Sequence, residues 1–220
     1  MEAEEELNRV LPADLPNREI VVSKAARHLA LIEEANRYLN LTRIVSPHEA
    51  AIKHVLDSVM PWRLFADAEH VVDAGSGAGF PGVPLALALP ATRFTLAESV
   101  QKKARFLETS VAALEMPNVT VAARRAEELT LAGGVDLITA RALAPVSRVL
   151  DLFGPALRKG ARVLLYKGPY ADREIADAAR EASRLRAQIR VAMRFDLPEN
   201  MGSRTMIEIA APQRPARDRC

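Results

Sequence analysis

A glycine-rich loop lies between two acidic residues, in the segment VVDAGSGAGFPG and the strand pattern that follows it. Asp73 ends a short β-branched run, and Gly75, Gly77 and Gly79 come directly after it. Glu98 follows at roughly the 20-residue distance at which nucleotide-binding βαβ units place a carboxylate on ribose hydroxyls. Glycines let the backbone approach a ligand without a Cβ clash. The pattern therefore predicts binding of a nucleoside-containing cofactor.

The spacing of these glycines favours S-adenosylmethionine (SAM) over a dinucleotide. The dinucleotide fingerprint G-x-G-x-x-G needs a glycine at position 80, where this chain has Phe80. SAM has no pyrophosphate, so it does not need the full phosphate cradle. The competing interpretation is a doubly wound sheet with an ordinary turn at this place.

The residue types also restrict which atom a SAM-dependent enzyme could methylate. The single cysteine, Cys220, is the last residue, which argues against the cysteine nucleophile used on C5 of cytosine. The segment after the fourth predicted strand reads Thr139-Ala140-Arg141-Ala142 instead of Asn-Pro-Pro-Tyr, so amino-group methylation is not expected. A ring nitrogen such as guanine N7 carries no proton and needs positioning but no general base. The chain is compatible with that acceptor.

Four cations are candidates for a basic rim around the predicted cofactor loop. Arg141 and Lys167 end the fourth and fifth predicted strands, at the edge where open α/β sheets bind ligands. Lys102 opens the helix after Glu98, and Arg125 follows the third strand. Arg141 could hold the cofactor carboxylate or an RNA phosphate. Each cation alone could also be an ordinary surface residue.

In nucleotide-binding α/β sheets that bind SAM, the turn after the third strand contacts the adenine ring. It holds Ala126 and Glu127, and Glu127 or the neighbouring backbone could pair with the adenine edge. Glu127 could equally stabilise a helix N-terminus. His54 and Asp57 lie about one turn apart on a predicted helix, and whether His54 contacts RNA or is structural stays open.

Alternating strand and helix patterns place these residues in one α/β sheet. No helix separates the last two strands, which we expect to form an antiparallel hairpin. A parallel sheet ending in such a hairpin is the Rossmann-like arrangement of class I SAM-dependent methyltransferases. Strands are predicted at 70–74, 93–97, 118–122, 135–139, 161–166, 188–195 and 204–210, and helices at 81–89, 101–115, 145–157 and 172–186.

Residues 1–69 predict an N-terminal helical appendage to the SAM-binding domain at 70–210. A helical period runs over 23–39, after a short lead-in helix or ordered arm. Ser46-Pro47-His48-Glu49 reads as a capping box that starts a helix over 47–60. Residues 211–220 are expected to be a flexible basic tail.

Composition limits the remaining possibilities. The chain has 220 residues, a net charge of +2 and one cysteine, so neither a disulfide within the chain nor a cysteine-rich metal site is expected. Apolar runs of about 18 residues, as membrane helices need, are missing. The acidic start does not resemble a signal peptide. We therefore expect a cytoplasmic protein without metal or membrane contact.

Several segments, in order, resemble the RsmG (GidB) family of bacterial methyltransferases, which modify guanine N7 in the 530 loop of 16S rRNA. The resemblance runs from about residue 40 to 167, and more loosely to 209. The glycine loop extended by Phe-Pro-Gly is its most specific part. The segments are Asn40-Leu41-Thr42, Lys53-His54-x-x-Asp57-Ser58, the loop at 73–82, Glu98-Ser99-x-x-Lys102-Lys103-x-x-Phe106-Leu107, Arg125-Ala126-Glu127-Glu128, Arg141-Ala142 and Lys167-Gly168.

The resemblance implies SAM as cofactor and 16S rRNA or the small ribosomal subunit as partner of a monomeric enzyme. It implies cofactor contacts at Gly75, Phe80, Ala126, Glu127 and Arg141; the loop pattern itself adds Gly77 and Glu98. It makes Lys102, Arg125, Arg141 and Lys167 candidates for an RNA-facing or catalytic rim. A SAM methyltransferase acting on another RNA, and a non-catalytic binding module in ribosome assembly, are the alternatives.

Two departures from the family pattern are small. Lys53 stands where the family usually has arginine, so a bidentate contact would be lost there. Ala74 replaces a larger aliphatic residue. Neither departure changes the predicted fold or cofactor.

Overall fold

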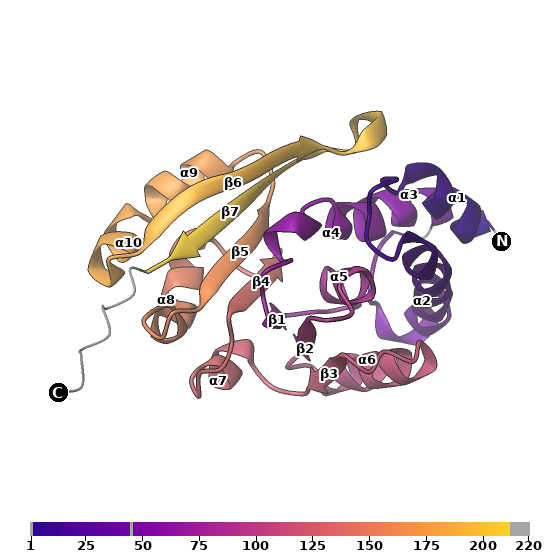
Figure 1. Ribbon diagram of the computed structural model, residues 1–220, viewed down its shortest axis with the longest axis horizontal. Coiled ribbons are helices and arrows are strands. Elements are labelled where there is room, and N and C mark those ends of the chain that lie inside the picture. The colour runs from indigo at the N-terminus through magenta and orange to yellow at the C-terminus, as the bar shows by residue number, and fades with distance from the viewer. Residues whose placement is uncertain (1, 45, 212–220) are drawn as a thin grey trace.

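Seven strands form one sheet with helices on both faces in the computed structural model, which describes residues 2–44 and 46–211 (Figure 1). The order across the sheet is β3-β2-β1-β4-β5-β7-β6, and the first five strands run parallel. The strands are β1 His70–Ala74, β2 Arg93–Ala97, β3 Val119–Ala122, β4 Leu137–Arg141, β5 Arg162–Lys167, β6 Gln188–Asp196 and β7 Ser203–Ala210. The predicted class I methyltransferase fold is confirmed.

The central strands are apolar on both sides because helices cover both faces of the sheet. Val71 and Val72 of β1 are buried, and they pair with Phe94 and Thr95 of β2. The last two strands form the predicted antiparallel hairpin, and β7 also pairs antiparallel with β5. The final strand of the chain therefore lies inside the sheet, and β6 forms the edge.

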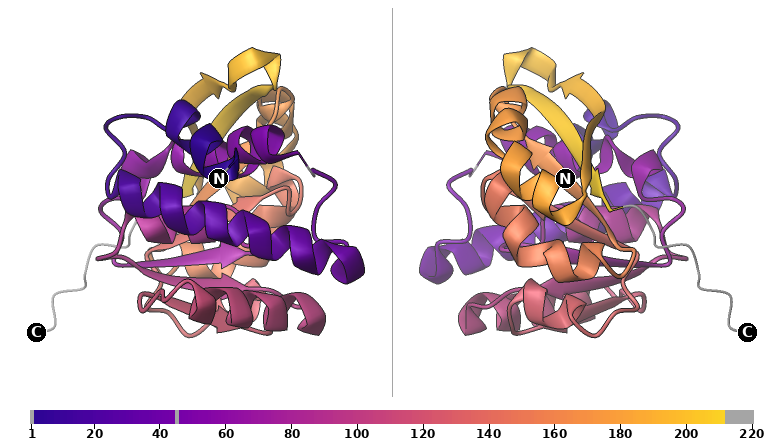
Figure 2. Two further views of the ribbon diagram at one scale, coloured as in Figure 1. Left: turned by 90° about the vertical axis from the view of Figure 1, so that its right-hand side faces the viewer. Right: turned by 90° about the vertical axis from the view of Figure 1, so that its left-hand side faces the viewer.

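The helices divide into two groups, one for each face of the sheet. Helices α5 and α6 join the N-terminal helices in one core, while α8, α9 and α10 build the core on the other face. Figure 2 shows these groups from opposite ends of the molecule. The helices are α1 Glu2–Val10, α2 Arg18–Leu39, α3 Pro47–Ala50, α4 Asp57–Val59, α5 Gly82–Ala88, α6 Gln101–Ala113, α7 Ala126–Thr130, α8 Val146–Leu157, α9 Ala171–Asp177 and α10 Ala179–Leu185.

Shorter turns complete the set of helical elements. A π-helical segment, Ala51–Leu56, joins α3 to α4, so the predicted helix at 47–60 contains one wider turn. Single 3₁₀ turns occur at Trp62–Leu64 and Pro198–Asn200. The Ser46 hydroxyl accepts the amide of Glu49 at 3.1 Å, which confirms this half of the predicted capping box. The Glu49 carboxylate instead binds Lys53 at 2.5 Å.

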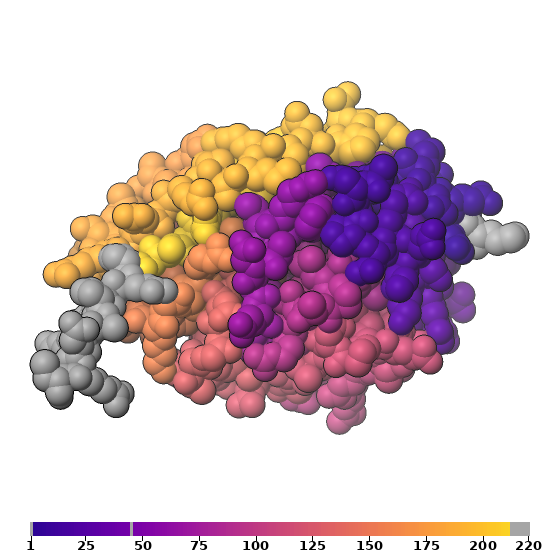
Figure 3. Space-filling model, in the orientation of Figure 1, coloured from indigo at the N-terminus to yellow at the C-terminus, as the bar shows by residue number. Residues whose placement is uncertain are grey.

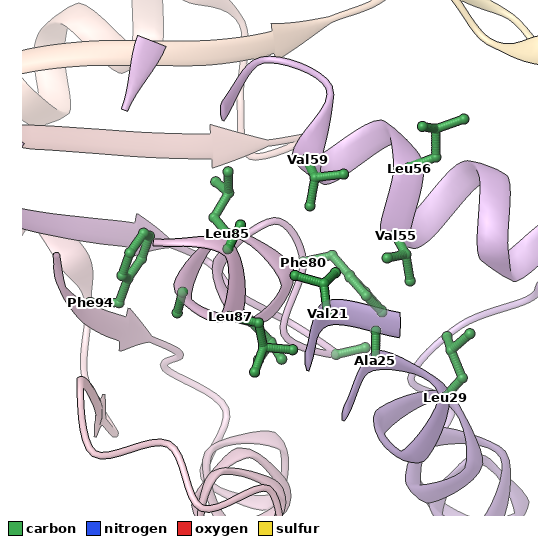
Figure 4. Close-up of a cluster of buried hydrophobic side chains, with 14 of the residues drawn as sticks. Val21, Ala25, Leu29, Val55, Leu56, Val59, Phe80, Leu85, Leu87 and Phe94 are labelled. Carbon is green, nitrogen blue, oxygen red and sulfur yellow. The ribbon is translucent and has the colours of Figure 1, made fainter. Parts of the chain in front are cut away.

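The N-terminal helices share a hydrophobic core with the sheet. Val21, Ala25 and Leu29 of α2 point toward Phe80 and Val55 (Figure 4), and all five are buried. The surface in Figure 3 is continuous between the N-terminal residues and the rest of the molecule on the face shown. This packing fixes the helix that carries His54 and Asp57 against the glycine loop.

Several predicted boundaries differ from the structure. The lead-in is a helix, α1, which was one of the two expected possibilities, but α2 begins at Arg18 instead of 23. The fourth strand begins at Leu137 instead of 135, and just before it the Asp136 carboxylate accepts the amides of Glu69 and His70. The predicted helix at 172–186 is two helices separated by Ala178, and α7 was not predicted as a helix. Nine residues of the predicted tail, 212–220, lie outside the described part of the chain.

The tip of the β6–β7 hairpin reaches back to the N-terminal helices. Both ring nitrogens of His48 lie 2.8 Å from a carboxylate oxygen, Nδ1 from Glu6 and Nε2 from Glu199, and the protonated ring donates to both. These two carboxylates raise the pKa of His48 above its usual range. The contact joins residues 151 positions apart in the chain.

Candidate active site

The glycine loop connects β1 to α5 in a conformation that only glycine adopts without strain. Gly75 has φ 72° and Gly77 has φ 57°, both in the left-handed region. The amides of Gly75 and Ser76 donate to the Ala97 carbonyl at 2.9 and 3.1 Å, which ties the loop to the end of β2. A Cβ atom on Gly75 would lie 2.9 Å from Cδ1 of Leu143. A side chain at this position would therefore collide with Leu143.

Glu98 follows β2 directly and faces the same loop. Its Oε2 accepts the amide of Gly77 at 3.0 Å and its Oε1 accepts the amide of Val100 at 2.8 Å. A carboxylate has about four lone-pair sites, so each oxygen can still accept a hydroxyl. The glycine loop and Glu98 therefore fit the ribose and amino-acid parts of a nucleoside cofactor.

Asp73 anchors the start of α5 beneath the loop. Its Oδ2 accepts the amide of Gly82 at 3.0 Å, while Oδ1 has no partner among the described residues. Burial raises the pKa of Asp73 to about 6. The carboxyl is a structural acceptor under the loop and does not reach its surface.

Arg141 is the centre of a polar network between the sheet and the N-terminal helices. Its Nη1 donates to the Lys53 carbonyl at 2.8 Å and to Asp57 at 3.3 Å. The guanidinium lies 5.4 Å from the ring centre of Phe80, in the glycine loop. Asp57, whose side chain is 1% exposed, also accepts Nε of Arg204 at 3.0 Å. The network joins β4, β7 and the helix at 47–59.

His54 is buried in the same network and is uncharged. Its ring stacks on Phe80 with centres 4.5 Å apart and planes 9° apart. Nε2 lies 2.9 Å from Oγ1 of Thr42, and Nδ1 lies 3.5 Å from Nη2 of Arg141. Burial, reinforced by the charge of Arg141, lowers the pKa of His54 to about 3. The histidine packs against Phe80 and is neutral, with one ring N–H, at neutral pH.

A cavity of about 430 Å³ opens beside this network, at the carboxyl ends of β4 and β5. Lys167 lines it and is only 10% exposed, because its ammonium binds Glu174 at 2.7 Å and the Ala144 carbonyl at 2.6 Å. The charged residues around the cavity are Lys53, Asp57, Arg141, Lys167, Glu174 and Arg204.

The four predicted rim cations do not lie around one opening. Arg141 and Lys167 line the cavity, on the β4–β5 side of the glycine loop. Lys102, at the start of α6, and Arg125, before α7, are exposed and follow β2 and β3 on the other side. Arg125 is 69% exposed, and its Nη1 lies 3.7 Å from Oε1 of Glu127.

Ala126 begins α7 directly after the turn that follows β3. It is buried and belongs to the core cluster of Ala74 and Ala97, the last residues of β1 and β2. Glu127, the next residue, is partly exposed at the first turn of α7. Both residues thus follow β3 at the strand edge that carries the glycine loop.

Two residues of the site could not be found from the sequence. Arg204 pairs with Asp57 from 147 positions away, and no spacing rule predicts such a partner. Glu174 sits in a helical pattern whose charges look like a solvated face, yet it binds Lys167 and the Val146 amide at 3.1 Å. The sequence marked only its partner, Lys167, as a basic residue at the end of β5.

The part of the chain at 2–44 and 46–211 contains no helix long and apolar enough to cross a membrane.

Comparison of the sequence with known proteins identifies a family. Residues 21–197 match the model of the GidB family, described as rRNA small subunit methyltransferase G. The chain is 60% identical over 205 residues to the Ribosomal RNA small subunit methyltransferase G of Solibacter usitatus, covering 93% of this chain and 98% of that protein. It is 36% identical over 187 residues to the protein of the same name from Carboxydothermus hydrogenoformans, covering 82% and 79%.

Solved structures resemble the fold at low sequence identity. The M1A22 tRNA methyltransferase TrmK of B. subtilis superposes with a TM-score of 0.59 at 15% identity, covering 74% of this chain and 68% of that one. The O-methyltransferase TomG of Streptomyces achromogenes, solved in complex with SAM, gives 0.55 at 15% identity, covering 84% and 90%. These likenesses show the fold alone, whereas the family match and the close relatives show that the chain belongs to the GidB family, rRNA small subunit methyltransferase G.

Proposed function

We propose that this protein transfers a methyl group from SAM to N7 of a guanine in the 530 loop of 16S rRNA. The proposal is carried by one observation: a chain of the GidB family joins its glycine loop and Glu98 to a polar cavity through Phe80 and Arg141. The cofactor side and the cavity side share these two residues. A donor site and an acceptor site in contact are what methyl transfer requires.

The proposed cofactor contacts follow from the fit of the loop. Gly75 and Gly77 would admit the amino-acid part of SAM, and Glu98 would accept the ribose hydroxyls. Ala126 and Glu127 would meet the adenine. Phe80 and Arg141 are the remaining proposed contacts, at the border with the cavity. SAM supplies a methyl group on a positively charged sulfur.

The chain's own residues would act by positioning and by charge balance. Guanine N7 has no proton to remove, and methylation places positive charge on the imidazole ring of the base. A free cation nearby would oppose that charge. Lys167 is paired with Glu174, and Arg141 shares the Asp57 carboxylate with Arg204, so both cations beside the cavity contact a carboxylate. These contacts lower the opposition to the positive charge that would form on the base.

The exposed cations are assigned to the RNA backbone. Lys102 and Arg125 would contact phosphates, which position a nucleic acid without reading its sequence. Lys167 would serve the target nucleotide inside the cavity. We propose that the enzyme works as a monomer in the cytoplasm, where small-subunit RNA is made.

A methyl-incorporation assay tests the function. Labelled SAM, the protein and either naked 16S rRNA or small subunits lacking the modification are incubated, and the methylated base is then mapped. The proposal expects one N7-methylated guanine in the 530 loop. Label in another RNA would support the first alternative, and tight RNA binding without label would support an assembly factor.

The Glu98→Ala variant should bind the cofactor roughly 10- to 100-fold more weakly. One charge-assisted hydrogen bond to ribose is worth about 1.5–3 kcal/mol, and 1.4 kcal/mol is about tenfold in affinity, so the loss of even one bond accounts for this range. The variant also loses the acceptor that holds Gly77. Calorimetric titration with S-adenosylhomocysteine measures the change, with Glu98→Gln as the milder control. Unchanged affinity with a lower melting temperature would make Glu98 purely structural.

The single-turnover rate should not depend on pH between about 7 and 8.5, because the proposed reaction needs no general base. His54, with a pKa of about 3, is neutral throughout this range. Asp73, with a pKa of about 6, has already lost its proton at the lower end of this pH range. Rates of the wild type and His54→Asn are compared at saturating SAM. A rate that rises steeply with pH in the wild type and is flat in His54→Asn would contradict this mechanism.

A further inference from the structure

We propose that the cavity at the ends of β4 and β5 is a guanine-reading subsite, and that Glu174 selects the base. The inference rests on the proposed function and adds to it the residue that would distinguish guanine from other bases. Glu174 would accept the N1–H and the exocyclic amine of the guanine, while Lys167 would donate to O6.

The size and position of the cavity suit a single nucleotide. Its volume of about 430 Å³ falls within the range of roughly 300–1,000 Å³ found for small-ligand sites. Arg141 lines it and lies over Phe80 of the glycine loop, so it borders the proposed methyl donor. Enzymes that modify a base commonly draw the nucleotide out of its stack and read its Watson–Crick edge in such a pocket.

Every cation of the cavity lining contacts a carboxylate. Arg141 and Arg204 share Asp57, and Lys53 binds Glu49. The fourth cation, Lys167, binds Glu174. Because two arginines share one carboxylate, the lining keeps a net positive charge, and Glu174 adds an acceptor to it. A ligand that both donates and accepts can use both kinds of group.

An unused donor and an unused acceptor lie together where Lys167 meets Glu174. The Lys167 ammonium has three donors and spends two of them, on Glu174 and on the Ala144 carbonyl. Oε2 of Glu174 accepts from Lys167 and from the Val146 amide, whereas Oε1 has no hydrogen bond among the described residues. One donor and one carboxylate oxygen thus lie side by side at the cavity.

This pair matches guanine and opposes adenine. The Watson–Crick edge of guanine presents an acceptor, O6, followed by two donors, N1–H and the amine. Adenine presents a donor followed by an acceptor, which would place N1 against the carboxylate. A site built to hydrogen-bond one edge strongly rejects a base that leaves its buried polar groups unpaired. Binding by this edge also leaves N7 free to accept the methyl group.

Inosine supplies the test because it keeps N7, O6 and N1–H but lacks the exocyclic amine. Small subunits are reconstituted with 16S rRNA that carries guanosine or inosine at the methylated position, and kcat/KM is measured for both. The wild type should prefer guanosine by about 10- to 100-fold, the worth of a hydrogen bond to a charged group. Glu174→Gln keeps an acceptor for the Val146 amide but loses the charge, and its preference should fall to within about threefold.

Asp172→Asn is the matched control, because Asp172 is an exposed acid on the same helix that binds Arg194 at 2.6 Å. It should keep the wild-type preference. Glu174→Asp, which retains the charge, replaces Glu174→Gln if that variant does not fold, and its preference should also drop. A variant that slows both substrates equally, or changes neither, would overturn the inference while leaving the proposed function intact. A wild type inactive on guanosine would overturn both.

Discussion

Gly75→Val is expected to weaken cofactor binding by about 100-fold or more. The residue has φ 72°, a conformation that costs a non-glycine residue roughly 1–3 kcal/mol and a β-branched one most of all. Its side chain would also meet Leu143, with Cβ only 2.9 Å from Cδ1. Moving the loop to relieve both strains would carry it away from Glu98. Affinity for S-adenosylhomocysteine, measured by calorimetry, is the direct readout.

Gly134→Val is the control for Gly75→Val, because it adds backbone strain without placing a side chain against the glycine loop. Gly134 has φ 75°, close to the value at Gly75, but a Cβ there would meet no atom within 4 Å. This control should lose a similar amount of stability and keep the wild-type affinity. If both variants bind the cofactor equally well, the glycine loop is only a turn and the cofactor lies elsewhere.

Asp57→Ala should lower the free energy of unfolding by about 3–5 kcal/mol, as removal of one partner of a buried ion pair does. The carboxylate is 1% exposed and accepts from both Arg141 and Arg204, so the variant leaves two guanidinium groups uncompensated. For a chain of this size the melting temperature should fall by roughly 6–20 °C. Thermal unfolding followed by circular dichroism measures it.

Asp14→Ala is the control for this experiment, because Asp14 forms an exposed ion pair with Arg63. Exposed pairs contribute little to stability, so its melting temperature should stay close to that of the wild type. Asp57→Asn, which preserves shape, should fall between the two. A melting temperature of Asp57→Ala equal to that of Asp14→Ala would show that Asp57 does not hold the network together.

The parts of the fold that local chemistry determines were predictable from the sequence. Short β-branched runs and glycine punctuation located all seven strands, and the missing helix after β6 predicted the hairpin. The boundaries that failed depend on tertiary contacts. The break at Ala178 has no proline or glycine to announce it, and the carboxylate of Asp136, just before β4, binds the amides of Glu69 and His70, which are distant in the sequence.

The sequence indicated the glycine loop, Glu98 and two of the cations that line the cavity, but not the residues that pair with those cations. Gly75, Gly77 and Glu98 are close in sequence, and their geometry follows from one βαβ unit. Lys167 reads from the sequence as a free cation, but its charge is compensated by a residue of the next helix, Glu174. Arg141 likewise reads as a ligand-binding cation, although it also carries the contact between two parts of the chain. Sequence patterns show which residues are charged. Which carboxylate neutralises which cation depends on distances that only the folded chain defines.

The place of β7 inside the sheet has a consequence for how the protein is made. Synthesis proceeds from the N-terminus, so Arg204 is the last part of the polar network to emerge, long after Asp57. Until β7 enters between β5 and β6, β5 has an unpaired edge that can associate with other chains. A nascent or truncated chain therefore holds the glycine loop before it holds a finished cavity.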